Sequence, residues 1–218
     1  MIRKLFKSGL IIFLSLTLAG CTFIFQKGRR SDIDKIRELS SQLDELTSAK
    51  NRLEDILSEE IRDKQVGLRM MKKGLVISVL GDVLFDSGKA KIRSGAYNIL
   101  DKIASVLNDK VVNLNVGIEG HTDNQPIRYS GWKSNWELST ARALSVLHYL
   151  IDEKQVAPER LSAIGNSEYS PVSSNDTKDD RQLNRRVEII ILPQLTKAKD
   201  IPAPLEEELL QEPEENLK

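Results

Sequence analysis

Cysteine, histidine and aromatic residues are scarce in this chain of 218 residues, and their scarcity limits its chemistry. One cysteine is present, so no disulfide can form within the chain. Two histidines leave few ligands for a metal and few groups for acid–base catalysis. Basic and acidic residues number 32 each, so the basic excess typical of nucleic-acid binding is missing. We therefore predict a protein that is not an enzyme, uses no cofactor or metal and binds no nucleic acid.

The amino terminus has the pattern of a bacterial export signal. Residues 1–20 carry three basic residues among the first seven, Arg3, Lys4 and Lys7, and an apolar run over residues 10–18 follows. This run is shorter than the roughly 20 residues that a membrane-spanning helix needs. It ends at Leu-Ala-Gly-Cys, which resembles the bacterial lipobox, so we expect cleavage after Gly20 and lipid attachment at Cys21. The alternative is an uncleaved amphipathic anchor with an incidental cysteine.

Residues 21–31 would then form a lipid anchor and a short basic tether. Thr22 follows the cysteine, where enterobacterial lipoproteins retained in the inner membrane carry aspartate. We therefore expect the outer membrane, with the rest of the chain in the periplasm.

Residues 32–66 contain no proline and follow a heptad pattern. Lys50 occupies one core position of the seam, and six apolar residues occupy others: Ile36, Leu39, Leu43, Leu46, Leu53 and Leu57. This pattern predicts a helical coiled-coil stalk that forms a homodimer. A single amphipathic helix packed on the following domain would show a similar pattern.

Residues 67–193 read as one compact α+β domain. Strands are predicted over residues 75–80, 112–119, 161–164 and 187–192. Helices are predicted from Ser94 and Ser134, with a brief helix ending near residue 186. The order β-α-β-α-β-(α)-β indicates a mixed sheet with helices on one face. Residues 194–218 are rich in glutamate and proline and predict a disordered acidic tail.

The segment from Gly117 to Arg142 places two opposite charges across a predicted strand-to-helix loop. A strand brings Asp123 to its end, and the helix from Ser134 brings Arg142 into its early turns. A carboxylate and a guanidinium that face each other can bind the ammonium and carboxylate of a zwitterion. They can also form a salt bridge that only ties the loop to the helix.

These charges lie in motifs that resemble a known family. GHTD, SNWELSTARA and NRRVEI follow one another along the chain, together with GDVLFDSGKAKI and AIGNSEYSPV. In this order they resemble the OmpA-like peptidoglycan-binding domain, across the whole predicted domain. The loop NQPIRYSGWKS is longer than in most of the family and resembles that of flagellar stator proteins.

The resemblance implies both a ligand and a set of contacts. In the family, the aspartate and arginine at these positions hold the diaminopimelate of the peptidoglycan stem peptide. Five further residues are expected at or near this ligand: Thr122 and Asn124 through backbone N–H groups, Leu138, Asn184 and Arg186. The alternative for Leu138 is a place in the core, and the alternative for Arg186 is a structural or rim role.

We therefore predict an outer-membrane lipoprotein that binds peptidoglycan non-covalently and tethers the membrane to the wall. Two alternatives use the same domain. A flagellar stator component would need a true membrane span with an ionisable residue. A scaffold of an envelope complex would act through the stalk and tail and would not need Asp123 or Arg142.

Overall fold

The computed structural model describes residues 32–127 and 131–194. The predicted signal peptide, lipid anchor and tether, and all of the predicted tail except Gln194, lie outside the described residues. Among the described residues, no helix has the length and apolar character needed to cross a membrane.

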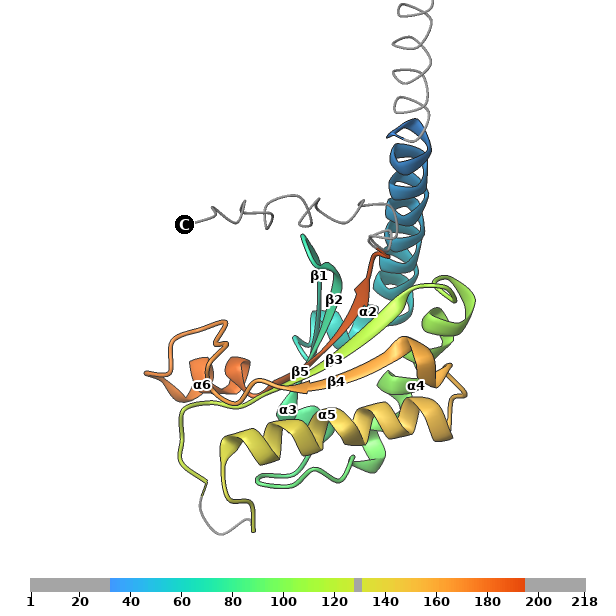
Figure 1. Cartoon of the computed structure of the whole chain (residues 1–218). Helices are drawn as coiled ribbons and strands as arrows, with labels where there is room; N and C mark the ends of the chain where they lie inside the picture. Colours follow the sequence, from blue (N-terminus) through green and yellow to red (C-terminus); the bar gives the residue numbers. More distant parts are fainter. Residues whose placement is uncertain (1–31, 128–130, 195–218) are drawn as a thin grey trace, which may run out of the picture.

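Five strands form one mixed sheet in the order β1-β2-β5-β3-β4 (Figure 1). They are β1 (Val66–Met71), β2 (Gly74–Leu80), β3 (Asn115–His121), β4 (Leu161–Gly165) and β5 (Arg186–Leu192). Strands β3 and β4 run parallel, and the other neighbours run antiparallel. The predicted α+β class with a mixed sheet is confirmed.

The N-terminal helix, α4 (Tyr97–Asp109) and α5 (Asn135–Asp152) pack on one face of this sheet. Apart from the N-terminal helix, α4 and α5 are the two longest helices of the described residues. The short elements are α2 (Ser58–Arg62), α3 (Gly81–Leu84), η1 (Ser94–Ala96), η2 (Pro158–Arg160) and α6 (Lys178–Asn184). Alternate residues of the central strands, such as Ile77, Ile118 and Ile189, are fully buried in one core with side chains of α4 and α5. The period-2 alternation of a strand puts these side chains on the helical face.

Two strand predictions differ from the structure. Strand β1 was not predicted, because this edge strand contains Gly67 and only its first residue is buried, so no alternation is visible. The strand predicted from Val112 begins at Asn115 instead. Val112 is exposed, and the backbone N–H of Leu114 donates to the carbonyl of Val111 in a turn that precedes the strand.

The N-terminal helix, which covers residues 32–56, packs on the core with its second half. Leu46, Leu53 and Leu57 of the predicted seam are buried there, whereas Ile36, Leu39 and Leu43 are exposed. In Figure 1 the first turns of this helix extend away from the sheet. The second half of the predicted seam is therefore used within the chain and is not free for a second helix.

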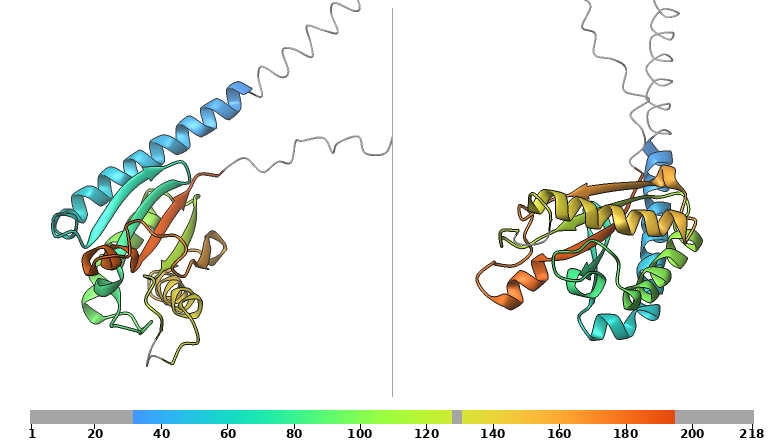
Figure 2. Two further views of the ribbon diagram at one scale, coloured as in Figure 1. Left: turned by 90° about the vertical axis from the view of Figure 1, so that its left-hand side faces the viewer. Right: turned by 90° about the horizontal axis from the view of Figure 1, so that it is seen from below.

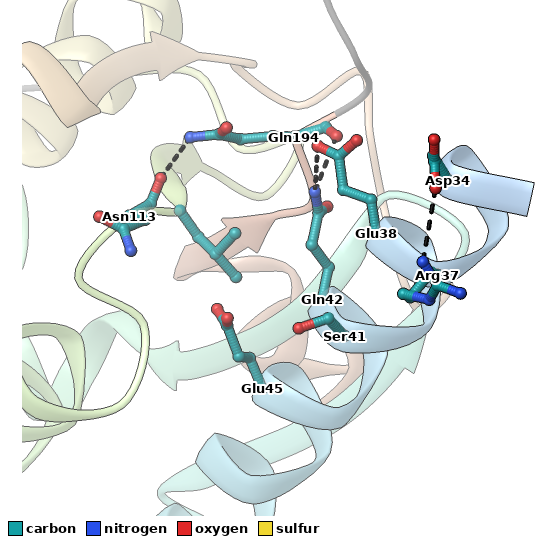
Figure 3. Close-up of a pocket in the computed structure, with 9 residues that line it drawn as sticks. Asp34, Arg37, Glu38, Ser41, Gln42, Glu45, Asn113 and Gln194 are labelled. Atoms are coloured by element: carbon teal, nitrogen blue, oxygen red, sulfur yellow. Dashed lines mark hydrogen bonds and ion pairs between the residues drawn. The ribbon is translucent and has the colours of Figure 1, made fainter. Parts of the chain in front are cut away.

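The middle of the N-terminal helix is tied to the end of β5. The amide of Gln42 donates to the carbonyl of Gln194 at 3.2 Å, and the amide of Gln194 donates to the carbonyl of Asn113 (Figure 3). Gln42 is buried although its neighbours on the helix are exposed. These bonds fix the helix against the same domain that its leucines contact.

Helix α5 begins in the predicted capping box. The hydroxyl of Ser134 accepts from the backbone N–H of Glu137, whose carboxylate accepts from the backbone N–H of Lys133. The apolar stripe predicted from Leu144, Leu147, Leu150 and Ile151 was wrong in part. Leu144 is exposed, and the buried face runs instead through Ser139, Ala143, Val146 and Leu150.

This face is buried because α5 lies very close to the ends of β3 and β4 (Figures 1 and 2). A Cβ atom on Gly120 would lie 2.0 Å from the carbonyl oxygen of Ser139. A Cβ atom on Gly165 would lie 2.1 Å from the hydroxyl oxygen of Thr140. Gly120 and Gly165 are partners across the two parallel strands, so together they form a flat seat for the first turns of the helix.

We expect Gly120→Ala to destabilise the domain by about 2–4 kcal/mol, because the methyl group would push α5 off the sheet. Gly117→Ala is the matched control, since a Cβ atom there meets nothing closer than 3.8 Å. Urea unfolding followed by circular dichroism measures both. Equal midpoints for the two variants would show that the close approach is not required.

Candidate functional site

A cavity of about 520 Å³ opens at the end of the sheet where β2 and β3 end and β5 begins. We call it the strand-end cavity. It is lined by Asp82, Phe85, Asp86, Ser87, Gly88, Arg93, Thr122, Asp123, Gln125, Pro126, Ile127, Asn135, Leu138, Arg142 and Arg185. Three aspartates and three arginines therefore share one cavity, which suits a ligand that carries both charges.

Asp123 lies two residues after the end of β3 and is 8 % exposed. One carboxylate oxygen accepts from the backbone N–H of Gln125 at 3.1 Å, which fixes the turn after the strand. The other accepts from Nη1 of Arg185 at 2.7 Å, and Nη2 of Arg185 donates to Asp82 at 2.9 Å. Burial lowers the pKa of Arg185, but these hydrogen bonds to Asp82 and Asp123 outweigh it and raise the pKa.

Arg142 is placed differently from the other two arginines of the cavity. Its side chain extends from α5, and the residue is 5 % exposed. Nε donates to the carbonyl of Lys89 at 3.0 Å, and the guanidinium carbon lies 5.2 Å from the ring centroid of Phe85. Within the described residues it forms no ion pair, whereas Arg185 pairs with two aspartates and Arg93 with Asp86.

The charge of Arg142 is therefore buried without a direct counter-ion. Burial lowers its pKa to about 10; the nearby Asp82 opposes this shift, Arg185 adds to it and Asp123 opposes it. The group stays protonated at neutral pH. A buried cation is unfavourable unless an anion or hydrogen-bond acceptors satisfy it. Thr122 adds a second unsatisfied group, because its buried hydroxyl has no partner among the described residues.

The structure brings together four of the seven predicted site residues. Thr122, Asp123, Leu138 and Arg142 line the strand-end cavity, whereas Asn124, Asn184 and Arg186 do not. The backbone N–H groups of Thr122 and Asn124, which were predicted to bind the ligand, instead donate to the carbonyl of Ser167 and the side chain of Asn175. The salt bridge between Asp123 and Arg142 that the sequence left open does not form either, since Asp123 pairs with Arg185.

Asn184 and Arg186 instead support the fold. The side chain of Asn184 is fully buried and bonds the backbone of Ser173 through both its oxygen and its nitrogen. Arg186 pairs with Glu188 at 2.8 Å on the sheet face opposite the helices. Successive residues at the start of a strand point to opposite sides, so Arg185 faces the cavity and Arg186 faces away.

Sequence reasoning missed Arg185, Asp82 and Phe85. Arg185 lies in the NRR motif, but the motif alone does not show which arginine faces the ligand. Asp82 lies in α3 and Phe85 follows its last residue, in a segment for which no helix or strand was predicted. The long loop after Asp123 is tied to the same region, because Nε1 of Trp132 donates to the carbonyl of Gly88 at 2.8 Å.

The opposite face of the sheet carries a separate charged cluster. Donor atoms of Glu119, His121 and Glu188 lie within 4.8 Å of one another. The ammonium of Lys73 lies 3.1 Å from Glu119 and 3.2 Å from Glu188, so a cation from the chain itself already occupies this position. The contact with His121 lowers the pKa of Glu119 to about 2, opposed by burial and helped by Lys73.

A second cavity, of about 400 Å³, lies between the N-terminal helix and the end of β5 (Figure 3). Its charged residues include Asp34, Glu38 and Arg37, all of which are solvent-exposed, and Arg37 pairs with Asp34. This cavity holds no buried charge that needs a partner, so the strand-end cavity is the candidate site.

Comparison with known proteins agrees with this assignment of fold. Residues 84–185 match the OmpA family, and the chain belongs to this family. Among solved structures it is similar to the cell wall anchor of the T6SS from Pseudomonas aeruginosa, with 34 % identity and a TM-score of 0.60. That match covers 66 % of this chain and 99 % of the other.

Curated relatives share the domain in longer proteins. Motility protein B of Bacillus subtilis is 39 % identical over 152 residues, which are 69 % of this chain and 57 % of that protein. The probable lipoprotein YiaD of Escherichia coli is 31 % identical over 143 residues, which are 64 % of this chain and 63 % of that protein. The chain thus spans little more than half the length of these relatives.

We expect the cluster of Glu119, His121 and Glu188 to make the free energy of unfolding depend on pH in the acidic range. Because folding lowers the pKa of Glu119 from 4.5 to about 2, its contribution is present above pH 4.5 and is lost as the pH falls towards 2. Glu119→Gln should therefore flatten the loss of unfolding free energy between pH 5 and pH 2. Glu59→Gln, at an exposed position of α2, is the control. Parallel curves for wild type and Glu119→Gln would contradict this account.

Proposed function

We propose that the chain binds peptidoglycan non-covalently, by gripping the free amino-acid end of diaminopimelate in the strand-end cavity. The observation that carries this proposal is Arg142, a buried guanidinium without an ion-pair partner among the described residues. Similarity to a cell wall anchor supports the proposal.

The free end of diaminopimelate carries a carboxylate and an ammonium on one carbon. The carboxylate would accept from the Nη groups of Arg142, in the bidentate geometry that lysine cannot reproduce. The hydroxyl of Thr122 offers a further donor. The ammonium would approach Asp123 and Asp82, which already share one cation, Arg185.

The same residues support binding rather than catalysis. The described lining of the cavity contains no histidine or cysteine, and two of its three aspartates, Asp82 and Asp123, are paired with Arg185. A fixed pair of opposite charges in a preformed cavity is sufficient for recognition.

We expect Arg142→Lys and Asp123→Asn each to weaken binding to diaminopimelate-type peptidoglycan at least about tenfold, because each removes a charge-assisted contact. Co-sedimentation of the purified chain with the polymer measures this. Peptidoglycan with lysine in place of diaminopimelate lacks the carboxylate for Arg142. Wild type should therefore bind this polymer as weakly as Arg142→Lys binds diaminopimelate-type peptidoglycan.

The matched controls are Arg62→Lys and Asp63→Asn, which change an exposed ion pair of the same two residue types at the end of α2. Both should sediment like wild type. If the cavity variants also sediment like wild type while folded, the charged residues of the cavity are structural and the proposal fails.

We further propose that the protein is an outer-membrane lipoprotein and links that membrane to the wall. The sequence LAGC at residues 18–21 and the similarity to a probable lipoprotein support this location. Incorporation of a palmitate analogue into the chain in bacteria, lost in Cys21→Ser, is the expected result. A labelled Cys21→Ser variant, or an unlabelled wild type, would contradict lipid attachment.

The similarity to motility protein B supports the alternative of a stator-like component. The labelling experiment separates the two, because a stator subunit held by a membrane span has no need of an acyl chain. A scaffold of an envelope complex would keep its partners when Asp123 and Arg142 are changed, whereas a wall anchor would lose the wall.

A homodimer through the first half of the N-terminal helix completes the proposal. Four apolar residues are exposed there, and their spacing of three to four residues places them on one face of the helix: Ile33, Ile36, Leu39 and Leu43. A second copy that paired with this stripe would bury them and double the number of wall contacts. Sedimentation velocity should show a dimer for wild type and a monomer for Leu39→Asp. A monomeric wild type at tens of micromolar would exclude this dimer.

A further inference from the structure

Two large aromatic side chains stack on each other at the surface beside the strand-end cavity. Trp136 lies in the first turn of α5, and Tyr169 lies in the loop after β4. Their ring centroids are 5.4 Å apart with 26° between the planes. Trp136 remains 49 % exposed and Tyr169 69 % exposed. Single exposed apolar residues need no explanation, but a stacked exposed pair in a chain with 5 % aromatics does.

The backbone holds this aromatic platform in place. Ser167, two residues before Tyr169, has a φ of +52°, a conformation that residues other than glycine rarely adopt. Two hydrogen bonds fix it: its carbonyl accepts from the N–H of Thr122 at 2.9 Å, and its N–H donates to the hydroxyl of Ser139 at 3.1 Å. Trp136 is held by the capped start of α5. Strain at such a position is typical of functional loops, and a rigid platform loses little entropy on binding.

The platform is continuous with the strand-end cavity. Asn135 lines the cavity, and its amide donates to the carboxylate of Glu168 at 2.9 Å and to the carbonyl of Gln125 at 3.1 Å. Asn135 precedes Trp136 in the chain, and Glu168 precedes Tyr169. The hydrogen bond between Asn135 and Glu168 therefore joins, at the rim of the cavity, the two residues that directly precede Trp136 and Tyr169.

The chemistry of this surface fits an uncharged sugar ring. The C–H face of a pyranose packs on an aromatic ring, and its hydroxyl and N-acetyl groups need polar partners. Asn135 and Glu168 are polar residues that directly precede Trp136 and Tyr169 in the chain and bond to each other. An anionic lipid surface fits poorly, because the charged groups next to the platform in the chain, Glu137 and Glu168, are acidic. In peptidoglycan the stem peptide is attached to such a sugar, so one ligand would reach both surfaces.

We propose that Trp136 and Tyr169 form a second subsite, which takes an N-acetylated pyranose of the glycan strand while the strand-end cavity holds the stem peptide. This subsite rests on the proposed function and adds the glycan to the ligand. The chain would then bind both the sugar and the stem peptide attached to it, rather than the diaminopimelate end alone.

Calorimetry of the full chain with two probes tests the subsite. The first probe is the stem tetrapeptide with diaminopimelate, and the second is the same peptide attached to its disaccharide. Wild type should bind the second about tenfold more tightly, because the sugar adds a stacking contact with the aromatic platform. Trp136→Ala and Tyr169→Ala should abolish the difference and keep the affinity for the peptide alone. Trp136→Phe should restore part of it.

Asp123→Asn serves as the contrasting variant, because it should lose affinity for both probes. If the two alanine variants, folded by circular dichroism, keep the preference for the disaccharide probe, the subsite is excluded while the wall-binding proposal stands. The same holds if wild type binds both probes equally. If wild type binds neither probe, the proposed function fails and the subsite fails with it.

Discussion

The site depends on the close contact between the start of α5 and the glycines at the ends of β3 and β4. Gly120 and Gly165 leave room for the backbone and side-chain oxygens of Ser139 and Thr140, and no larger residue could stand there without moving the helix. This contact sets the position of Arg142 one turn further along α5. It also fixes Ser139, whose hydroxyl holds the loop that carries Tyr169. The packing of α5 on the sheet therefore also positions the residues that we propose to bind the ligand.

The charged residues of the strand-end cavity are paired in a way that leaves Arg142 without an ion-pair partner among the described residues. A salt bridge between Asp123 and Arg142 would have satisfied both groups and left nothing for a ligand. Instead Arg185 pairs with both Asp123 and Asp82, which leaves one excess negative charge among the three groups, and Arg142 keeps its own charge although burial lowers its pKa to about 10. An incoming carboxylate would relieve the cost of that buried charge, and the two aspartates would still attract an ammonium. The cavity is therefore complementary to a zwitterion rather than to a simple anion.

The sequence was sufficient for features that depend on local pattern. Apolar runs, alternation and capping located four strands and the start of α5, and the motifs pointed to Asp123 and Arg142, which both line the strand-end cavity. It was insufficient where the partner of a surface decides the outcome. A heptad pattern does not show whether its leucines meet a second helix or, as for Leu53, the core of the same chain. Nor does the NRR motif show that Arg185 rather than Arg186 faces the cavity, because a shift of one residue at a strand start reverses the side.

The central claim is that Arg142 receives a carboxylate of the ligand. Nuclear magnetic resonance of the arginine side chains in the full chain tests it most directly. Addition of a stem tetrapeptide with diaminopimelate should shift the Nε–H signal of Arg142 and slow rotation of its guanidinium. The same peptide with lysine, which lacks the carboxylate, should leave that signal unchanged. Equal shifts with both peptides, or no shift at Arg142 with either, would contradict the account.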